Sequence, residues 1–94
     1  MAIKSVRGSL IRSIIDGKRA KRFPTDLVQR AENRLALLEA ATSLDALRIP
    51  PGNRLEALSG DRKGQFSIRI NSQWRVCFGW DDGNAYHVEI VDYH

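Results

Sequence analysis

The segment Trp74–His94, with the sequence WRVCFGWDDGNAYHVEIVDYH, predicts two antiparallel strands joined by a tight turn. Apolar and polar side chains alternate on both sides of Asp81–Asn84, and this period of two is typical of half-buried strands. Within the turn, Gly83 can adopt a positive φ without steric cost, as short hairpin turns require. The residues that we expect to enter the core from the second strand are Tyr86, Val88 and Ile90.

Residues before this hairpin predict three further strands and two helices. Clean alternation predicts a strand over Gln65–Ile70, another is expected over Asn53–Leu58, and Ala2–Val6 is expected to form a short edge strand. The first helix is expected from Arg7 to Gly17 with an apolar stripe of Leu10, Ile14 and Ile15. The second runs from Phe23 to about Ala41, because apolar residues recur at spacings of four, four and three at Leu27, Ala31, Leu35 and Leu38.

Helices followed by a run of antiparallel strands predict an α+β fold, with both helices packed on one face of the sheet. The 94 residues, 43% hydrophobic and 28% charged, suit a single domain spanning residues 1–94. No apolar run approaches the ~20 residues of a membrane helix, and no signal peptide opens the chain, so we expect a cytoplasmic protein without membrane contact.

The sequence offers no pattern for a bound metal or a prosthetic group. No spacing of histidine, cysteine and carboxylate side chains resembles a zinc site, and neither a serine hydrolase motif nor a phosphate-binding loop occurs. The single cysteine, Cys77, excludes a disulfide within one chain, and we expect it to be a packed, inert thiol. We therefore expect no metal and no cofactor.

Positive charge is concentrated near the amino terminus. Residues 1–23 carry seven basic side chains and one acidic side chain, within a total net charge of +4. Such a basic segment favours a polyanionic partner, most commonly nucleic acid, whereas the alternative is a solvated basic surface. The connector between the two expected helices contributes the candidate RNA-binding residues Lys18, Arg19, Lys21 and Arg22.

Strand alternation places Arg69 and Arg75 on the sheet face opposite the helices, because successive side chains point to opposite sides. We call this surface the open face and define it by Arg69, Arg75, Glu89 and Tyr93. Guanidinium groups bind phosphates with paired hydrogen bonds and a phenol stacks on a base, so the open face could bind RNA. The alternative is that Arg69 pairs with Glu89 and that Arg75 is merely solvated. Candidate RNA-binding residues here are Arg69, Asn71, Arg62 and Lys63.

The last strand leads directly into Asp92-Tyr93-His94, a group of three side chains that can bind or release protons. Imidazole is the side chain best suited to proton transfer near neutral pH, so this segment is a candidate for acid–base chemistry. A frayed polar tail is the alternative. In a catalytic role, His94 would transfer a proton as general acid or base.

Several segments resemble the HigB-type killer toxins of plasmid-maintenance systems, within the RelE/ParE superfamily. The resemblance rests on Asn53–Asn71 (NRLEALSGDRKGQFSIRIN), on Gln73–Phe78 (QWRVCF) and on the closing Asp92-Tyr93-His94. Residues 3–5 and the second expected helix match as well, so it covers nearly the whole chain.

This resemblance implies a compact fold similar to microbial RNases and a metal-free endoribonuclease that cuts messenger RNA in the decoding site of the ribosome, the A site of the 16S rRNA. It also implies a cognate HigA-like antitoxin with a helix-turn-helix, through which alone operator DNA would be bound. By the same resemblance, Asp92, Tyr93 and His94 match the carboxy-terminal active-site residues of the family, and Arg75 matches its catalytic arginine.

The chain also departs from the family pattern. Some members carry a histidine and a lysine where this chain has Glu56 and Ser59, and an arginine where it has Asn71. A slow toxin, or an inactive interaction module with the toxin fold, is therefore an alternative. A ParE-like gyrase poison is another, although that branch has no need for the acid–base residues at positions 92–94.

Overall fold

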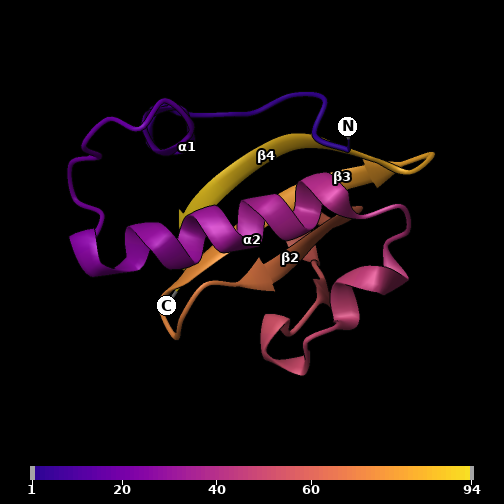
Figure 1. Cartoon of the computed structure of the whole chain (residues 1–94). Coiled ribbons are helices and arrows are strands. Elements are labelled where there is room, and N and C mark those ends of the chain that lie inside the picture. The colour runs from indigo at the N-terminus through magenta and orange to yellow at the C-terminus, as the bar shows by residue number, and fades with distance from the viewer. Residues whose placement is uncertain (1, 94) are drawn as a thin grey trace.

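The computed structural model describes residues 2–93, which form two α-helices on one face of a four-stranded antiparallel sheet (Figure 1). The helices are α1 (Ser9–Ile15) and α2 (Val28–Ala40). The strands are β1 (Glu56–Ala57), β2 (Gln65–Arg69), β3 (Trp74–Asp81) and β4 (Asn84–Asp92), and each pairs with the next. Short 3₁₀ turns cover Thr25–Leu27, Asp45–Arg48, Pro51–Asn53 and Gly60–Arg62. The α+β class expected from the sequence is confirmed. Neither α1 nor α2 has the length and hydropathy of a membrane-spanning helix, and residues 2–93 contain no other candidate.

The core lies between the helices and the sheet. All four members of the predicted stripe of the second helix are buried there: Leu27, Ala31, Leu35 and Leu38. They meet the apolar side of the central strands, where Ile68, Val76 and Phe78 are fully buried. Burial of each large apolar side chain contributes roughly 1.5–3 kcal/mol, so this interface is the main source of stability.

Helix α1 differs from its prediction in length and in orientation. It covers seven residues and begins after Gly8, whose φ of 94° lies in the left-handed region that glycine tolerates. Ile11 and Ile14 are buried, whereas Ile15 is 55% exposed. The predicted stripe is therefore wrong at Ile15, because Ile11 and Ile14, three residues apart, share the inward side and the next residue turns away from it.

The turn between β3 and β4 is the predicted hairpin. Asp82 and Gly83 both have positive φ values, of 50° and 78°. Two consecutive positive values are the mark of the turn whose twist matches that of the flanking strands.

Strand β4 contains a β-bulge that changes which side chains enter the core. Cys77 pairs with Glu89 but Gly79 pairs with Tyr86, so β4 has one extra residue in this interval, and His87 has a φ of 53°. Alternation is reversed across the bulge. Ala85 is consequently fully buried, while Tyr86 pairs with a residue of the open face, which corrects its prediction as a core residue.

The amino-terminal segment runs beside β4 without forming the predicted edge strand. It makes two isolated parallel bridges, from Ile3 to Ala85 and from Val6 to Val88. Between them, the backbone N–H of His87 donates to Ser5 Oγ at 2.9 Å. The bulge thus interrupts the ladder, and the serine hydroxyl accepts the hydrogen bond that a regular strand would have accepted through its backbone.

The strand predicted over Asn53–Leu58 is reduced to the two residues of β1, which pair with Ser67 and Phe66. The prediction of a strand beginning at Asn53 is wrong, because Asn53 is fully buried and ends a 3₁₀ turn over Pro51–Asn53. The Asn53 side chain donates to the carbonyls of Leu47 and Ile49, which closes this segment on itself rather than on the sheet.

Replacement of Ile11 by alanine should destabilise the protein by about 2–5 kcal/mol, because it removes methylene groups from a closed core. The matched change Ile15→Ala, four residues along the same helix, should alter the free energy of unfolding by less than about 0.5 kcal/mol. Urea denaturation of both variants measures this difference. Equal losses would show that α1 does not pack as described.

Candidate active site

Arg75 is buried although it carries a charge, with 8% of its surface exposed. Its Nε donates to Ser67 Oγ at 2.8 Å, and its Nη2 donates to the carbonyl oxygen of Arg54 at 2.6 Å. A buried cation needs such partners, because desolvation without them costs several kcal/mol. The alternative in which Arg75 is merely solvated is therefore wrong.

The Arg54 carbonyl is placed by the turn before β1. Arg54 follows the 3₁₀ turn at Pro51–Asn53 and adopts a left-handed backbone with a φ of 45°. The buried Asn53 amide holds this turn through its two backbone hydrogen bonds. Local backbone geometry thus supplies an acceptor to a side chain on β3.

The remaining edge of the guanidinium faces Glu56 and Tyr93. Arg75 Nη1 lies 3.6 Å from Glu56 Oε1, and Glu56 pairs in register with Ser67, so both project from the same face of the sheet. Arg75 Cζ lies 5.9 Å from the centroid of the Tyr93 ring, within the range of cation–π attraction. The phenol is 41% exposed, so its ring is accessible to a ligand.

The end of β4 brings the predicted carboxy-terminal residues beside Arg75. Asp92 pairs with Trp74 and accepts a hydrogen bond from Gln73 Nε2 at 3.2 Å. The backbone N–H of Tyr93 donates to the Gln73 carbonyl. Tyr93 therefore lies beside Arg75 at one end of the open face, whereas Asp92, the register partner of Trp74, projects from the opposite face of the sheet. His94, the fourth predicted catalytic residue, lies outside the described residues.

Residues 60–64 fold over the middle of the open face. Arg62 Nη1 donates to Glu89 Oε1 at 2.6 Å, and this hydrogen bond raises the pKa of the arginine. The alternative in which Arg69 pairs with Glu89 is wrong, because the Arg62 side chain reaches over the sheet and pairs with that carboxylate. Cys77, opposite Glu89, is fully buried, and burial raises the pKa of its thiol. Within residues 2–93, no cluster of three or more histidine, cysteine or carboxylate side chains could hold a metal.

Three other predicted RNA-binding residues take different positions. Arg69 is paired with Arg75 in register, and its carbonyl accepts a hydrogen bond from Arg34 of α2 at 2.8 Å. The Asn71 side-chain oxygen accepts hydrogen bonds from the backbone N–H groups of Gln73 and Trp74, so it stabilises the turn between β2 and β3. Lys63 is exposed at the end of the 60–64 segment.

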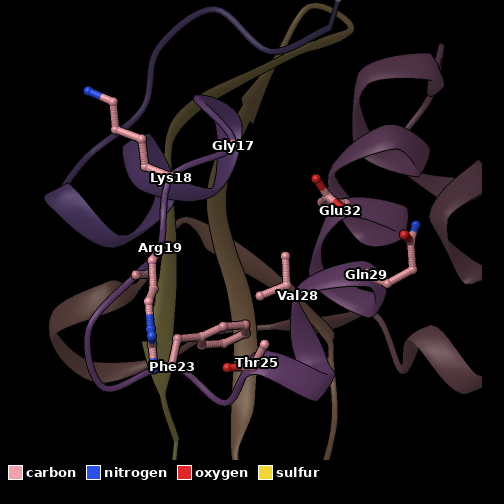
Figure 2. A pocket seen from close by; sticks show the side chains of 9 residues that line it. Gly17, Lys18, Arg19, Phe23, Thr25, Val28, Gln29 and Glu32 are labelled. Carbon is pink, nitrogen blue, oxygen red and sulfur yellow. The ribbon is translucent and has the colours of Figure 1, made fainter.

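The basic connector lies on the helix side of the molecule rather than on the open face. Lys18, Arg19, Lys21 and Arg22 are all exposed there. A cavity of about 690 Å³ lies between the connector and α2, and Phe23 and Val28 are among the residues that line it. The Lys18 ammonium group is directed away from this cavity (Figure 2). None of the residues around Arg75 lines this cavity. Phe23 contacts Trp74 edge-to-face, with ring centroids 5.0 Å apart, so the connector lies near the start of β3.

Three contacts of Arg75 were not predicted from the sequence: Ser67, the Arg54 carbonyl and Glu56. Ser67 could have been found, because strand alternation places it on the same face two residues before Arg69. The other two depend on how residues 47–57 fold, for which the sequence carries no periodic signal.

Replacement of Arg62 by alanine should destabilise the protein by about 1–3 kcal/mol, because it leaves the largely buried Glu89 carboxylate without its cation. The adjacent Lys63→Ala change removes an equal charge from an exposed side chain and should cost less than about 0.5 kcal/mol. Thermal or urea unfolding of the two variants measures the contrast. Similar values for both would contradict a structural role of the Arg62–Glu89 pair.

Comparison with known proteins identifies the family. Residues 7–94 match the model of HigB-like toxins, described as RelE-like toxins of the type II toxin-antitoxin system HigB. Toxin HigB-1 of Vibrio cholerae is 46% identical over 70 residues, which are 74% of each chain. Endoribonuclease HigB of Proteus vulgaris is 30% identical over 92 residues, which are 98% of this chain and 99% of the relative.

Solved structures show the same fold at low sequence identity. YafQ from Escherichia coli has a TM-score of 0.64 at 14% identity, covering 96% of this chain and 90% of YafQ. The Staphylococcus aureus YoeB-YefM complex contains a chain with a TM-score of 0.63 at 16% identity, covering 100% of this chain and 97% of that one. The family predicted from the sequence is confirmed: this chain belongs to the HigB-like toxins, the RelE-like toxins of type II toxin-antitoxin systems.

Proposed function

We propose that this toxin is a ribosome-dependent endoribonuclease that cuts messenger RNA in the A site, with the scissile linkage bound at Arg75 on the open face. Family membership supports the toxin class, and the Proteus vulgaris relative, aligned with 98% of this chain, is named as an endoribonuclease. The observation that carries the proposal is the buried Arg75 guanidinium, which is held from behind by Ser67 and Arg54 and faces the exposed ring of Tyr93.

In the proposed reaction, the ribose 2′-hydroxyl attacks the adjacent phosphorus and releases its proton to water, while the bond from phosphorus to the 5′ oxygen breaks. The products are a cyclic phosphate and a free 5′-hydroxyl. Arg75, assisted by Arg69, stabilises the negative charge that develops on the phosphate oxygens. His94 donates the proton that the departing 5′ oxygen requires, and Asp92 orients the imidazole. Tyr93 stacks on a base through its exposed ring.

The proposed partners follow from this activity. A type II toxin has a protein antitoxin, and we propose a HigA-like helix-turn-helix protein that binds operator DNA on behalf of the complex. A fold neighbour was solved as the YoeB-YefM complex, which supports a protein partner for this fold. A ribosomal target places the toxin in the cytoplasm.

The basic connector would bind ribosomal RNA. Its four cations are exposed, and the contact between Phe23 and Trp74 places the connector near the end of the sheet that carries Arg75. Contacts between such side chains and phosphates are independent of base sequence and depend strongly on salt concentration.

His94→Ala and Arg75→Ala should each lower the rate of messenger cleavage on purified ribosomes by at least about 100-fold, because each removes a group that acts on the transition state. Both variants should lose growth arrest on expression without the antitoxin. Antitoxin binding, measured by co-purification, should remain for His94→Ala, which shows that the variant is folded.

Full toxicity of His94→Ala would refute the assignment of the acid. Gyrase-dependent DNA cleavage by the wild-type toxin, without cleavage of ribosome-bound message, would show the ParE-like alternative. Normal growth on overexpression of the wild-type chain would show the inactive module.

Charge removal from the connector tests the ribosome contact separately. The double variant Lys18→Ala, Arg19→Ala should weaken ribosome binding, and the slope of log affinity against log salt should become shallower by about 0.7–0.9 per lost phosphate contact. Arg48→Ala removes an exposed cation from the 3₁₀ turn at Asp45–Arg48 and should leave the slope nearly unchanged. Equal slopes for wild type and double variant would place the contact elsewhere.

A further inference from the structure

We propose that Arg30 and Arg34 of α2 form a second phosphate site, which binds the backbone of the message beside the scissile linkage. This inference rests on the proposed binding of the message at Arg75 and extends it to the flanking nucleotides. The two arginines lie on the helix layer, where α2 passes the turn between β2 and β3 (Figure 1). They belong neither to the connector nor to the open face.

The two guanidinium groups are held side by side on backbone carbonyls. Arg34 Nε donates to the carbonyl oxygen of Arg69 at 2.8 Å, and Arg30 Nη1 donates to that of Ile70 at 3.4 Å. Residues four apart in a helix lie on the same side of it, so both side chains reach the end of β2 together. Bonds to neutral carbonyls fix the position of each guanidinium without compensating its charge.

No acidic side chain compensates either charge. Among residues 2–93, Arg30 and Arg34 form no ion pair, whereas Arg48 and Arg62 each pair with a carboxylate. Partial burial and the positive charge of Arg30 lower the pKa of Arg34. Like charges in this arrangement destabilise a helix. An anion that contacts both guanidinium groups would remove this repulsion, so the pair is suited to bind one.

Enough donors remain on both side chains to bind a phosphate. Arg34 uses its Nε and keeps Nη1 and Nη2, while Arg30 uses one N–H of Nη1 and keeps Nε and Nη2. Arg30 is exposed and Arg34 is half-buried, so a ligand can reach them from solvent. Guanidinium groups bind phosphate oxygens through paired hydrogen bonds, which suits the phosphodiester of RNA.

Arg69 connects this pair to Arg75. It is the register partner of Arg75, and its two neighbours in the chain are core residues, so its side chain projects from the open face. In the part of the chain that the structure describes, the pairing of β2 with β1 does not extend beyond Ser67, and the edge of β2 beside Arg69 has no strand against it. Arg34 reaches this edge through its bond to the Arg69 carbonyl. A series of cations therefore runs from the open face around the edge of the sheet, and we call it the arginine track: Arg75, Arg69, Arg34 and Arg30.

The arginine track fits the message better than folded ribosomal RNA. Its first cation, Arg75, is the proposed ligand of the scissile phosphate, so the strand that continues from that phosphate is the message itself. A flexible single strand can follow cations around the edge of a sheet, as strands do in the positively charged grooves of proteins that bind single-stranded nucleic acid. Double helices are stiff over such short distances and would contact one face alone.

The alternative is a structural role, in which the two arginines only cover the open edge of β2 and prevent it from pairing with another chain. Such a role predicts lower stability or aggregation when they are replaced, but no dependence on the charge of any phosphate. A thermodynamic cycle that combines a change in the side chains with a change in the RNA therefore distinguishes the two roles.

The test measures affinity for ribosomes carrying a message whose scissile nucleotide is 2′-O-methylated and therefore cannot be cleaved. Linkages on either side of that nucleotide are replaced one at a time by methylphosphonate, which is uncharged. The double variant Arg30→Gln, Arg34→Gln should bind the unsubstituted message at least about tenfold more weakly, because charge-assisted hydrogen bonds are lost. At least one neutral linkage should weaken binding of the wild type to a similar extent and have no further effect on the double variant.

Further variants serve as controls. Arg30→Lys, Arg34→Lys retains both charges and should recover part of the affinity, although lysine lacks the paired donors. Arg48→Gln removes an exposed arginine outside the arginine track, and neutral linkages should weaken its binding as they weaken that of the wild type. Urea denaturation measures the stability of each variant separately. The single variant Arg30→Gln, at the exposed position, provides the same cycle if the double variant does not fold.

Additive effects at every linkage, or wild-type affinity of the double variant, would overturn the proposal. Equally weaker binding of the double variant to ribosomes with and without a message would assign the pair to ribosomal RNA, and loss of antitoxin co-purification alone would assign it to an acidic protein segment. Both results contradict a message site. If the wild-type chain does not cleave the unmethylated message, the proposed function fails, whereas the cycle measured by binding still decides whether the arginine track holds the message.

Discussion

A charged guanidinium packed against the sheet imposes the strongest local constraint on this fold. Only 8% of the Arg75 surface is exposed. Its guanidinium donates hydrogen bonds to two separate segments, to Ser67 of β2 and to the Arg54 carbonyl. Loss of such partners would leave a buried charge uncompensated, at a cost of roughly 3–5 kcal/mol. The turn before β1 and the position of Arg75 therefore stabilise each other. Binding of a phosphate needs little reorganisation of the cation, which is the condition under which electrostatic stabilisation is most effective.

Strand β4 has different neighbours at its two ends. Near the hairpin it runs beside the amino-terminal segment, and at its other end it carries Asp92 and leads to Tyr93. The bulge at His87 lets Ala85 and Val88 both face the core across an odd spacing. Beyond the bulge, Glu89 remains on the open face, where Arg62 pairs with it and holds residues 60–64 over the sheet.

The parts of the structure that follow from local periodicity were predictable. The stripe of α2 and the shared face of Arg69, Arg75 and Glu89 depend only on the repeats of helix and strand. The Tyr86 prediction failed because one inserted residue reverses the alternation, and that bulge is completed by Ser5, 82 positions earlier in the chain. The partner of Glu89 was not predicted for a similar reason. Arg62, which pairs with Glu89, belongs to a loop, and only tertiary packing determines the course of a loop.

The site shows the same division. Alternation was sufficient to select Arg75 and its face, but it gave no indication that Glu56, on a strand of two residues, lies beside the guanidinium. Very short strands have too few residues to show a period, so their side chains cannot be assigned to a face in advance. Contacts made by such a segment are found only when the register of the pairing is known.

The start of β3 connects two regions to which we assign RNA contacts. Trp74 points to the core side, where its ring meets Phe23 of the connector, and the next residue, Arg75, points to the open face. The two regions also differ in exposure: the connector cations are in solvent, whereas Arg75 is buried. Salt screens exposed charges much more than buried ones. Attachment to a polyanion through the connector should therefore respond to ionic strength largely independently of the binding of the scissile phosphate, so that one small domain can adjust its affinity for the ribosome without altering the group that stabilises the transition state.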